Sequence, residues 1–126
     1  MPYSKSVHTV RASAAVTGSY VAGTVFGMDR QNYLGVLIQY TNGDETSLEV
    51  KIETSVDGGI TYGQQTAESA SGGTVAVDLA ERQFDASGNY WVIVSPLICD
   101  RVRISVKATG GTPTGTCAIT AVTSTV

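Results

Sequence analysis

Two stretches of this chain alternate strictly between apolar and polar residues, and this alternation restricts the fold more than any other feature. In "TSLEVKIETS", residues 46–55, the apolar side chains of Leu48, Val50 and Ile52 alternate with charged ones. The same pattern recurs in "RVRISVKA", residues 101–108. Because successive side chains of a strand point to opposite faces, each stretch is predicted to be a strand with one buried and one wet face.

Further strands are predicted in segments bounded by Gly, Ser, Asn or Asp. These are residues 7–17, 19–26, 33–41, 73–80, 89–95 and 115–124. The stretches "YLGVLIQYT" and "NYWVIVS" are apolar on both faces, which indicates central strands or a surface that contacts a partner. Only "LAERQFDASG", residues 79–88, favours a helical turn. The sequence therefore predicts eight or nine strands in total.

Composition agrees with an all-β protein. The chain has 126 residues, with 14 Gly and 3 Pro, and is rich in Thr and Val. Gly supplies tight corners, and β-branched residues fit a pleated surface. The predicted fold is an antiparallel two-sheet β-sandwich, jelly-roll-like or immunoglobulin-like, formed by residues 9–126 as one domain behind an N-terminal arm of residues 1–8.

Turn residues predict how the strands connect. Asn42 and Gly43 stand between two strong strands, and Asn-Gly is a frequent hairpin turn because both residues accept positive φ. The strands on either side of this turn are therefore predicted to pair antiparallel. Polar, Gly-rich tips at "SASGGT" and "KATGGTPTGT" are candidates for contact with another chain, since such tips are mobile unless something holds them.

The stretch "SVDGGITY", residues 55–62, has the spacing Ser-x-Asp-x-Gly-x-Thr followed by an aromatic residue. It resembles the Asp-box of sialidases, a motif that stabilises a hairpin away from the active site. A propeller of the sialidase type needs more blades than 126 residues supply. We therefore interpret Ser55, Asp57, Gly58, Gly59 and Thr61 as a structural turn, in which Asp57 accepts backbone hydrogen bonds and the glycines adopt positive φ.

The sequence offers little for catalysis. The single histidine, His8, lies in an alternating segment, and Cys117 is best explained as a small buried residue. Glu49 and Glu53 share a strand face with Lys51 between them, which is typical of a solvated face, and no zinc spacing or phosphate loop is present. The sequence therefore predicts no enzyme, no cofactor and no metal site, with a cation bound at Asp44 or Asp57 as the alternative. The distant Cys99 and Cys117 can pair only if their strands are neighbours.

Charge and hydropathy exclude several partners. A net charge of −3 provides no basic face for nucleic acid. No apolar run is long enough to span a membrane, and the N-terminus has no apolar signal region, so we expect no membrane partner and synthesis in a cytoplasm.

The runs "LIQYTNGDETSLEVKIETSVDGGITY" and "RVRISVKATGGTPTGTCAITAVTS" resemble small virion proteins of tailed bacteriophages. The type most similar is the capsid decoration, or cement, protein. That resemblance implies a non-enzymatic structural protein on the capsid exterior, bound to the major capsid protein, often as a homotrimer. A neck or tail component and a carbohydrate-binding module remain as alternatives.

The arm is the predicted contact region. Its residues Pro2, Tyr3, Lys5 and His8 are candidates for contact with the capsid or a neighbouring subunit. Tyr3 would serve as an amphipathic anchor, and Lys5 would face acidic groups of the capsid.

Overall fold

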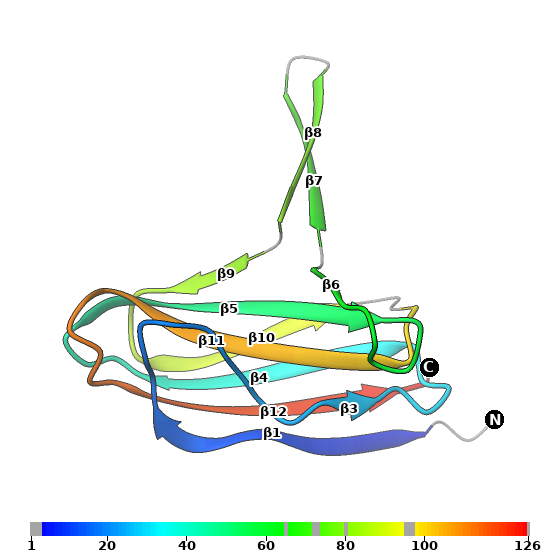
Figure 1. The fold of residues 1–126 in the computed structure, drawn as a ribbon, viewed down its shortest axis with the longest axis horizontal. Coiled ribbons are helices and arrows are strands. Elements are labelled where there is room, and N and C mark those ends of the chain that lie inside the picture. The colour runs from blue at the N-terminus through cyan, green and yellow to red at the C-terminus, as the bar shows by residue number, and fades with distance from the viewer. Residues whose placement is uncertain (1–3, 65, 72–73, 80, 95–97, 126) are drawn as a thin grey trace.

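The computed structural model describes residues 4–64, 66–71, 74–79, 81–94 and 98–125. Among these residues there are strands and no helices (Figure 1), and so no helix that could cross a membrane. The strands are β1 (Lys5–Ala15), β2 (Val21–Ala22), β3 (Phe26–Gly27), β4 (Tyr33–Thr41), β5 (Glu45–Ser55), β6 (Gly63–Gln64), β7 (Thr66–Ser71), β8 (Thr74–Leu79), β9 (Glu81–Phe84), β10 (Gly88–Val94), β11 (Arg101–Gly111) and β12 (Thr116–Ser124).

Two antiparallel sheets lie face to face (Figure 1). The four-stranded sheet has the order β1-β12-β4-β10. The six-stranded sheet has the order β2-β11-β5-β6, with β3 also paired to β11 and β9 to β5. The predicted all-β, two-sheet antiparallel sandwich is confirmed.

The core lies between the two sheets and consists of the apolar side chains that alternation points inward. In the six-stranded sheet, β5 and β11 pair so that Ile52 faces Ile104 and Val50 faces Val106, all at most 1% exposed. The four-stranded sheet contributes Leu34, Val36, Ile38, Tyr40, Val92, Val94, Cys117, Ile119 and Ala121. Burial of these side chains, at about 1.5–3 kcal/mol for each large one, is the main stabilising term.

The predicted hairpin at Asn42-Gly43 is wrong. β4 pairs with β10 and β12, whereas β5 pairs with β6, β9 and β11, so the two strands belong to different sheets. Gly43 is not among the positive-φ glycines. The connection crosses from one sheet to the other, so that the apolar faces of β4 and β5 are buried against the same core from opposite sides.

The predicted helical turn in residues 79–88 is also wrong. Glu81–Phe84 forms β9, which pairs antiparallel with β5. The ring of Phe84 stacks on that of Tyr90, with centroids 4.3 Å apart. Sheet pairing and this ring contact override the weak helical preference of a four-residue segment.

The strand pair β7 and β8 stands apart from the sandwich. Within the part of the chain that the structure describes, each of its strands pairs only with the other, in a separate two-stranded sheet. In Figure 1 the pair rises from the edge of the sandwich, between β6 and β9.

Candidate functional site

The outward side of the four-stranded sheet is apolar over its middle rows. Residues directly opposite one another on neighbouring strands share a face. One row across the sheet therefore holds Val7, Val122, Gly35 and Ile93, and the next holds Thr9, Thr120, Leu37 and Trp91. We call the six residues Val7, Gly35, Leu37, Trp91, Ile93 and Val122 the apolar face.

The apolar face is built around a glycine. A Cβ atom at Gly35 would lie 3.4 Å from Cζ3 of Trp91 and 3.5 Å from Cδ1 of Ile93, so both side chains lean over this position. Trp91 nevertheless remains 57% exposed and Ile93 68% exposed. Beside them is a groove of about 360 Å³ lined by Lys5, Tyr33, Leu34, Gly35, Trp91, Ile93, Val122 and Ser124. Large exposed apolar side chains gathered in a groove indicate a contact surface.

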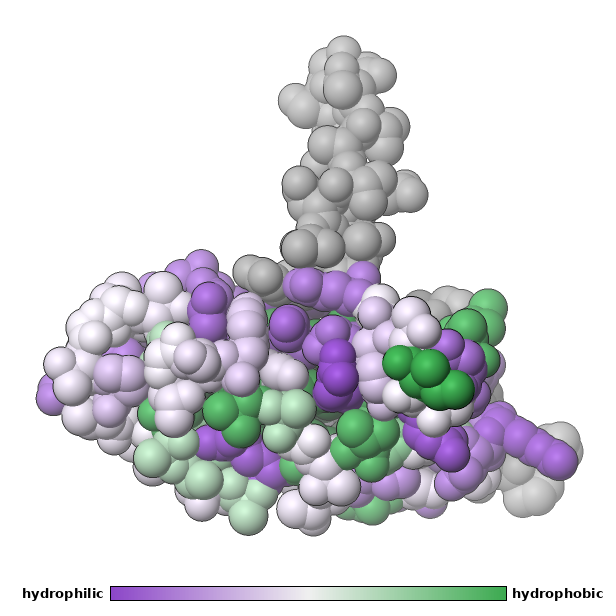
Figure 2. Space-filling view, viewed as in Figure 1, coloured by the Kyte–Doolittle hydropathy of each residue, from purple (hydrophilic) through white to green (hydrophobic). Residues whose placement is uncertain are grey.

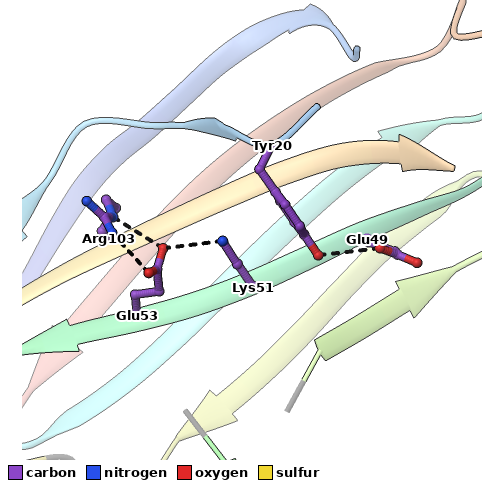
Figure 3. A network of polar contacts seen from close by, with 5 residues as sticks. All are labelled: Tyr20, Glu49, Lys51, Glu53 and Arg103. Atoms are coloured by element: carbon purple, nitrogen blue, oxygen red, sulfur yellow. Dashed lines mark hydrogen bonds and ion pairs between the residues drawn. The ribbon is translucent and has the colours of Figure 1, made fainter. Parts of the chain in front are cut away.

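The outward side of the six-stranded sheet is of the opposite kind (Figure 3). Arg103 donates to both carboxylate oxygens of Glu53, at 3.2 Å and 2.9 Å. Lys51 lies 3.9 Å from Glu53, and Tyr20 donates to Glu49. A surface of paired charges is typical of a solvated face, whereas the four-stranded sheet offers apolar side chains with no polar partners to satisfy.

The aromatic pair Tyr90 and Trp91 is divided between the two sides of β10. Tyr90 points toward the core, stacks on Phe84 and donates to the carbonyl of Ala86 at 2.6 Å. Trp91 points outward. Alternation in the sequence predicts this division, and the structure adds that Trp91 joins Tyr33 in lining the groove.

The structure describes two of the four predicted arm residues, Lys5 and His8. Pro2 and Tyr3 lie outside the described residues. Lys5 is exposed and lines the groove, while His8 stacks on Phe26, with centroids 4.7 Å apart, and its Nε2 lies 3.1 Å from Oγ1 of Thr123. Since β1 begins at Lys5, the arm boundary at residue 8 falls inside a strand of the sheet.

The "SVDGGITY" turn is held by Asp57. Its Oδ1 accepts hydrogen bonds from the hydroxyl of Ser55 at 2.6 Å and from the amides of Ile60 and Thr61 at 3.1 Å and 2.9 Å. These bonds, the Ser55 hydroxyl first, lower the pKa of Asp57 to about 2. Gly58 and Gly59 have φ values of 77° and 93°, which glycine adopts without strain.

The same turn exposes apolar side chains to solvent, a feature that the sequence prediction missed. Val56 and Ile60 are 77% and 86% exposed, and Ile98 is 88% exposed. The amide of Gly58 donates to the carboxylate of Asp100, which ties the turn to the segment that carries Ile98. Figure 2 shows an apolar patch at this end of the sandwich. Apolar residues within a rigid glycine turn are the sequence signal for such a patch, because a turn cannot bury them.

The nucleophile candidates are not activated. Cys99 and Cys117 are both free. Burial raises the pKa of Cys117 to about 11, so its thiol remains protonated at neutral pH. Among the described residues no three His, Cys, Asp or Glu side chains converge as metal ligands.

Comparison with known proteins gives similarity of fold without similarity of sequence. No protein-family model and no curated protein sequence matches the chain. The SPBc2 prophage-derived protein YomS matches 99% of this chain and 96% of its own, with a TM-score of 0.53 and 13% identity. The VP2 subviral particle of infectious bursal disease virus matches 98% of this chain with a TM-score of 0.52 and 6% identity.

A structure of the Gx strain of the same virus gives a TM-score of 0.53 at 8% identity. The likeness is one of fold. This chain spans about a third of the two viral chains, 33% and 32%, and nearly the whole of YomS. A β-sandwich of this size therefore occurs both as a complete prophage protein chain and as part of larger viral chains.

Proposed function

We propose that this chain is a non-enzymatic virion structural protein of a tailed bacteriophage, which binds the outside of the capsid and stabilises it as a decoration protein. The observation that carries the proposal is the apolar face, exposed on one sheet while the other sheet presents paired charges. A prophage-derived protein and the VP2 protein of a subviral particle have a similar fold, which supports the assignment to virion structural proteins.

The composition of the apolar face suits a protein contact. Interfaces concentrate binding energy in a few aromatic and large apolar side chains at the centre, inside a polar rim. The largest apolar side chains of the face, Trp91 and Ile93, project from β10 and lean over Gly35 of β4, while Lys5 and Ser124 lie at the opposite margin. A homotrimer would present three such faces to the major capsid protein, so that weak contacts multiply through avidity.

A carbohydrate-binding module is the second candidate, because Trp91 and Tyr33 line one groove. Sugar recognition requires aromatic stacking together with several hydrogen-bonding groups. Besides the hydroxyl of Tyr33 and the indole N–H of Trp91, only Lys5 and Ser124 among the lining residues have side chains that can form hydrogen bonds. The groove therefore favours an apolar protein segment over a glycan.

We expect the Trp91→Ala variant to bind capsids at least tenfold more weakly than the unmodified chain, because a tryptophan that anchors an interface is worth about 2 kcal/mol or more. Its folding should change little, since Trp91 is 57% exposed. Heads from a phage lacking this gene would be titrated with each variant, and bound copies counted by quantitative gel. Val25→Ala, at a residue 41% exposed outside the apolar face, is the control.

Copy number separates decoration from its alternatives. Hundreds of copies per virion are expected of a decoration protein and about a dozen of a neck or tail ring, by capsid and ring symmetry. A dozen copies would replace the decoration assignment with the neck or tail. Absence from virions, together with glycan binding that Trp91→Ala abolishes, would replace both with the carbohydrate-binding module.

A further inference from the structure

The edges of the two sheets differ in how well they resist pairing with another chain. Natural sheets blunt their edges with short strands, bulges and charged residues. In the six-stranded sheet, β2, β3 and β6 have two residues each and β9 has four. In the four-stranded sheet, β1 has two register shifts, on either side of Arg11, and carries Lys5. These edges are all protected.

The remaining edge, β10, has none of these protections. Its seven residues, "GNYWVIV", pair with β4 in unbroken register and include no charged residue and no proline. On its other side no described strand pairs with it. Trp91 and Ile93 stand exposed along it. A regular, uncharged, apolar edge strand is a template for the addition of another strand.

The hairpin formed by β7 and β8 has no neighbouring strand among the described residues. Its two six-residue strands pair with each other and with no described strand of the sandwich. Figure 1 shows the hairpin directed away from the rest of the molecule. A two-stranded hairpin alone in water is marginally stable and is stabilised when further strands join it. Its strands nearly match β10 in length, six residues against seven.

The charges of the hairpin disfavour its pairing with a second hairpin. The hairpin sequence from Thr66 to Leu79 contains Glu68 and Asp78 and no Lys or Arg. The β10 strand contains no charged residue. Pairing between two hairpins would bring acidic segments together, whereas a hairpin at the β10 edge meets no like charge on that strand.

We propose that the β7–β8 hairpin of one copy of this chain adds to the β10 edge of the next copy. The hairpin and the edge are different surfaces, so the contact is heterologous and closes into a ring when the rotation between copies allows it. The inference rests on the homotrimer within the proposed function and identifies the contact that forms it. Capsid binding is not needed to test it.

Two variants remove one surface each. In the first, residues 65–80 are replaced by a glycine-serine link of about four residues. This link is sufficient because Gln64 pairs with Glu53 and Glu81 with Lys51, two positions apart on β5. In the second, Ile93→Lys places a charge on the β10 edge. Val7→Lys is the matched control, since Val7 is 63% exposed on the opposite edge strand of the same sheet.

Light scattering during gel filtration would measure the mass of each variant at micromolar concentration. We expect the unmodified chain and Val7→Lys to form the same oligomer, a multiple of 13.1 kDa, and both other variants to fall to a single chain. Mixed together, the hairpin-deleted and Ile93→Lys chains should form a 1:1 heterodimer, since one still has the edge and the other the hairpin. Circular dichroism checks folding, with Trp91→Lys as a second edge variant.

Other outcomes would overturn the proposal. A hairpin-deleted chain that keeps the full oligomer, while Ile93→Lys is monomeric, would mean that β10 pairs with β10 across a two-fold axis. A monomeric unmodified chain would exclude self-association through either surface. Because no capsid is present, neither result would bear on whether the apolar face binds one.

Discussion

Replacing Glu45 with glutamine should lower the free energy of unfolding by about 3 kcal/mol at neutral pH. Glu45 begins β5 and is only 3% exposed, yet it is charged. A buried charge is tolerated only when its hydrogen bonds are satisfied, and removing them leaves donors without partners.

The carboxylate of Glu45 joins three separate parts of the chain. Its Oε1 accepts hydrogen bonds from the amides of Thr114 and Gly115, at 2.9 Å and 2.8 Å. Its Oε2 accepts from the amide of Gly43 at 2.8 Å and from the hydroxyl of Tyr40. Glutamine would present an NH₂ group in place of one oxygen, so two of these donors would face a donor.

The pH dependence of this contribution has a definite sign. Burial on its own would raise the pKa of Glu45, but the hydrogen bonds from Tyr40, Gly43, Thr114 and Gly115 outweigh burial and lower the pKa from 4.5 to about 2. At about 1.4 kcal/mol per pKa unit, this difference corresponds to roughly 3 kcal/mol. Because the folded-state pKa is the lower one, this stabilisation is complete above pH 4.5 and is lost as the pH falls toward 2.

Urea unfolding at pH 7, 4.5 and 2.5 would measure this effect. The unmodified chain should lose stability over that range, while Glu45→Gln should lose less because it no longer has this carboxylate. Glu49→Gln is the control: Glu49 is paired with Lys107 at 3.5 Å on the partly exposed face and should change stability by under about 1 kcal/mol. Equal effects of the two substitutions would contradict the role given to Glu45.

The sequence predicted features of the fold that depend on neighbouring residues, such as individual strands, but not which strands pair. Alternation in residues 46–55 and 101–108 identified two strands that do pair, with Ile52 opposite Ile104. Asn42-Gly43, in contrast, is a local turn signal that says nothing about the partners of the strands on either side. Two of the partners of Glu45, Thr114 and Gly115, lie about 70 residues later in the chain, where a pattern of neighbouring residues contains no information about them.

The candidate site was predictable to the same degree. Alternation in "NYWVIVS" separates Trp91 from Tyr90 and marks β10 as apolar on its outward side. What places Trp91 over Gly35 is the order β12-β4-β10 and the register of Ile93 opposite Gly35, both set by packing of distant segments. The unprotected β10 edge follows from the same order, since an edge exists only relative to the strand that pairs on the other side.

Gly115→Ala should destabilise the fold by about 3 kcal/mol, although alanine normally costs little in an extended segment. A Cβ at Gly115 would overlap Oε2 of Glu45, lie 2.5 Å from the carbonyl oxygen of Thr41 and lie 3.0 Å from the amide of Gly43. Two of these atoms are backbone, so the connections between β4 and β5 and between β11 and β12 must separate. Gly18→Ala is the control, because a Cβ there meets nothing within 4 Å.

A double-substitution cycle distinguishes a general clash from a clash with the Glu45 carboxylate. In a Glu45→Ala background the overlap with Oε2 is gone while that with Thr41 remains, so Gly115→Ala should cost about 1 kcal/mol less than it does in the unmodified chain. Chemical denaturation of the four variants gives the coupling directly. Strict additivity would show that Gly115 acts through the backbone alone. A coupling of about 1 kcal/mol would show that Gly115 is required because Glu45 must reach the amides of the loop that precedes β12.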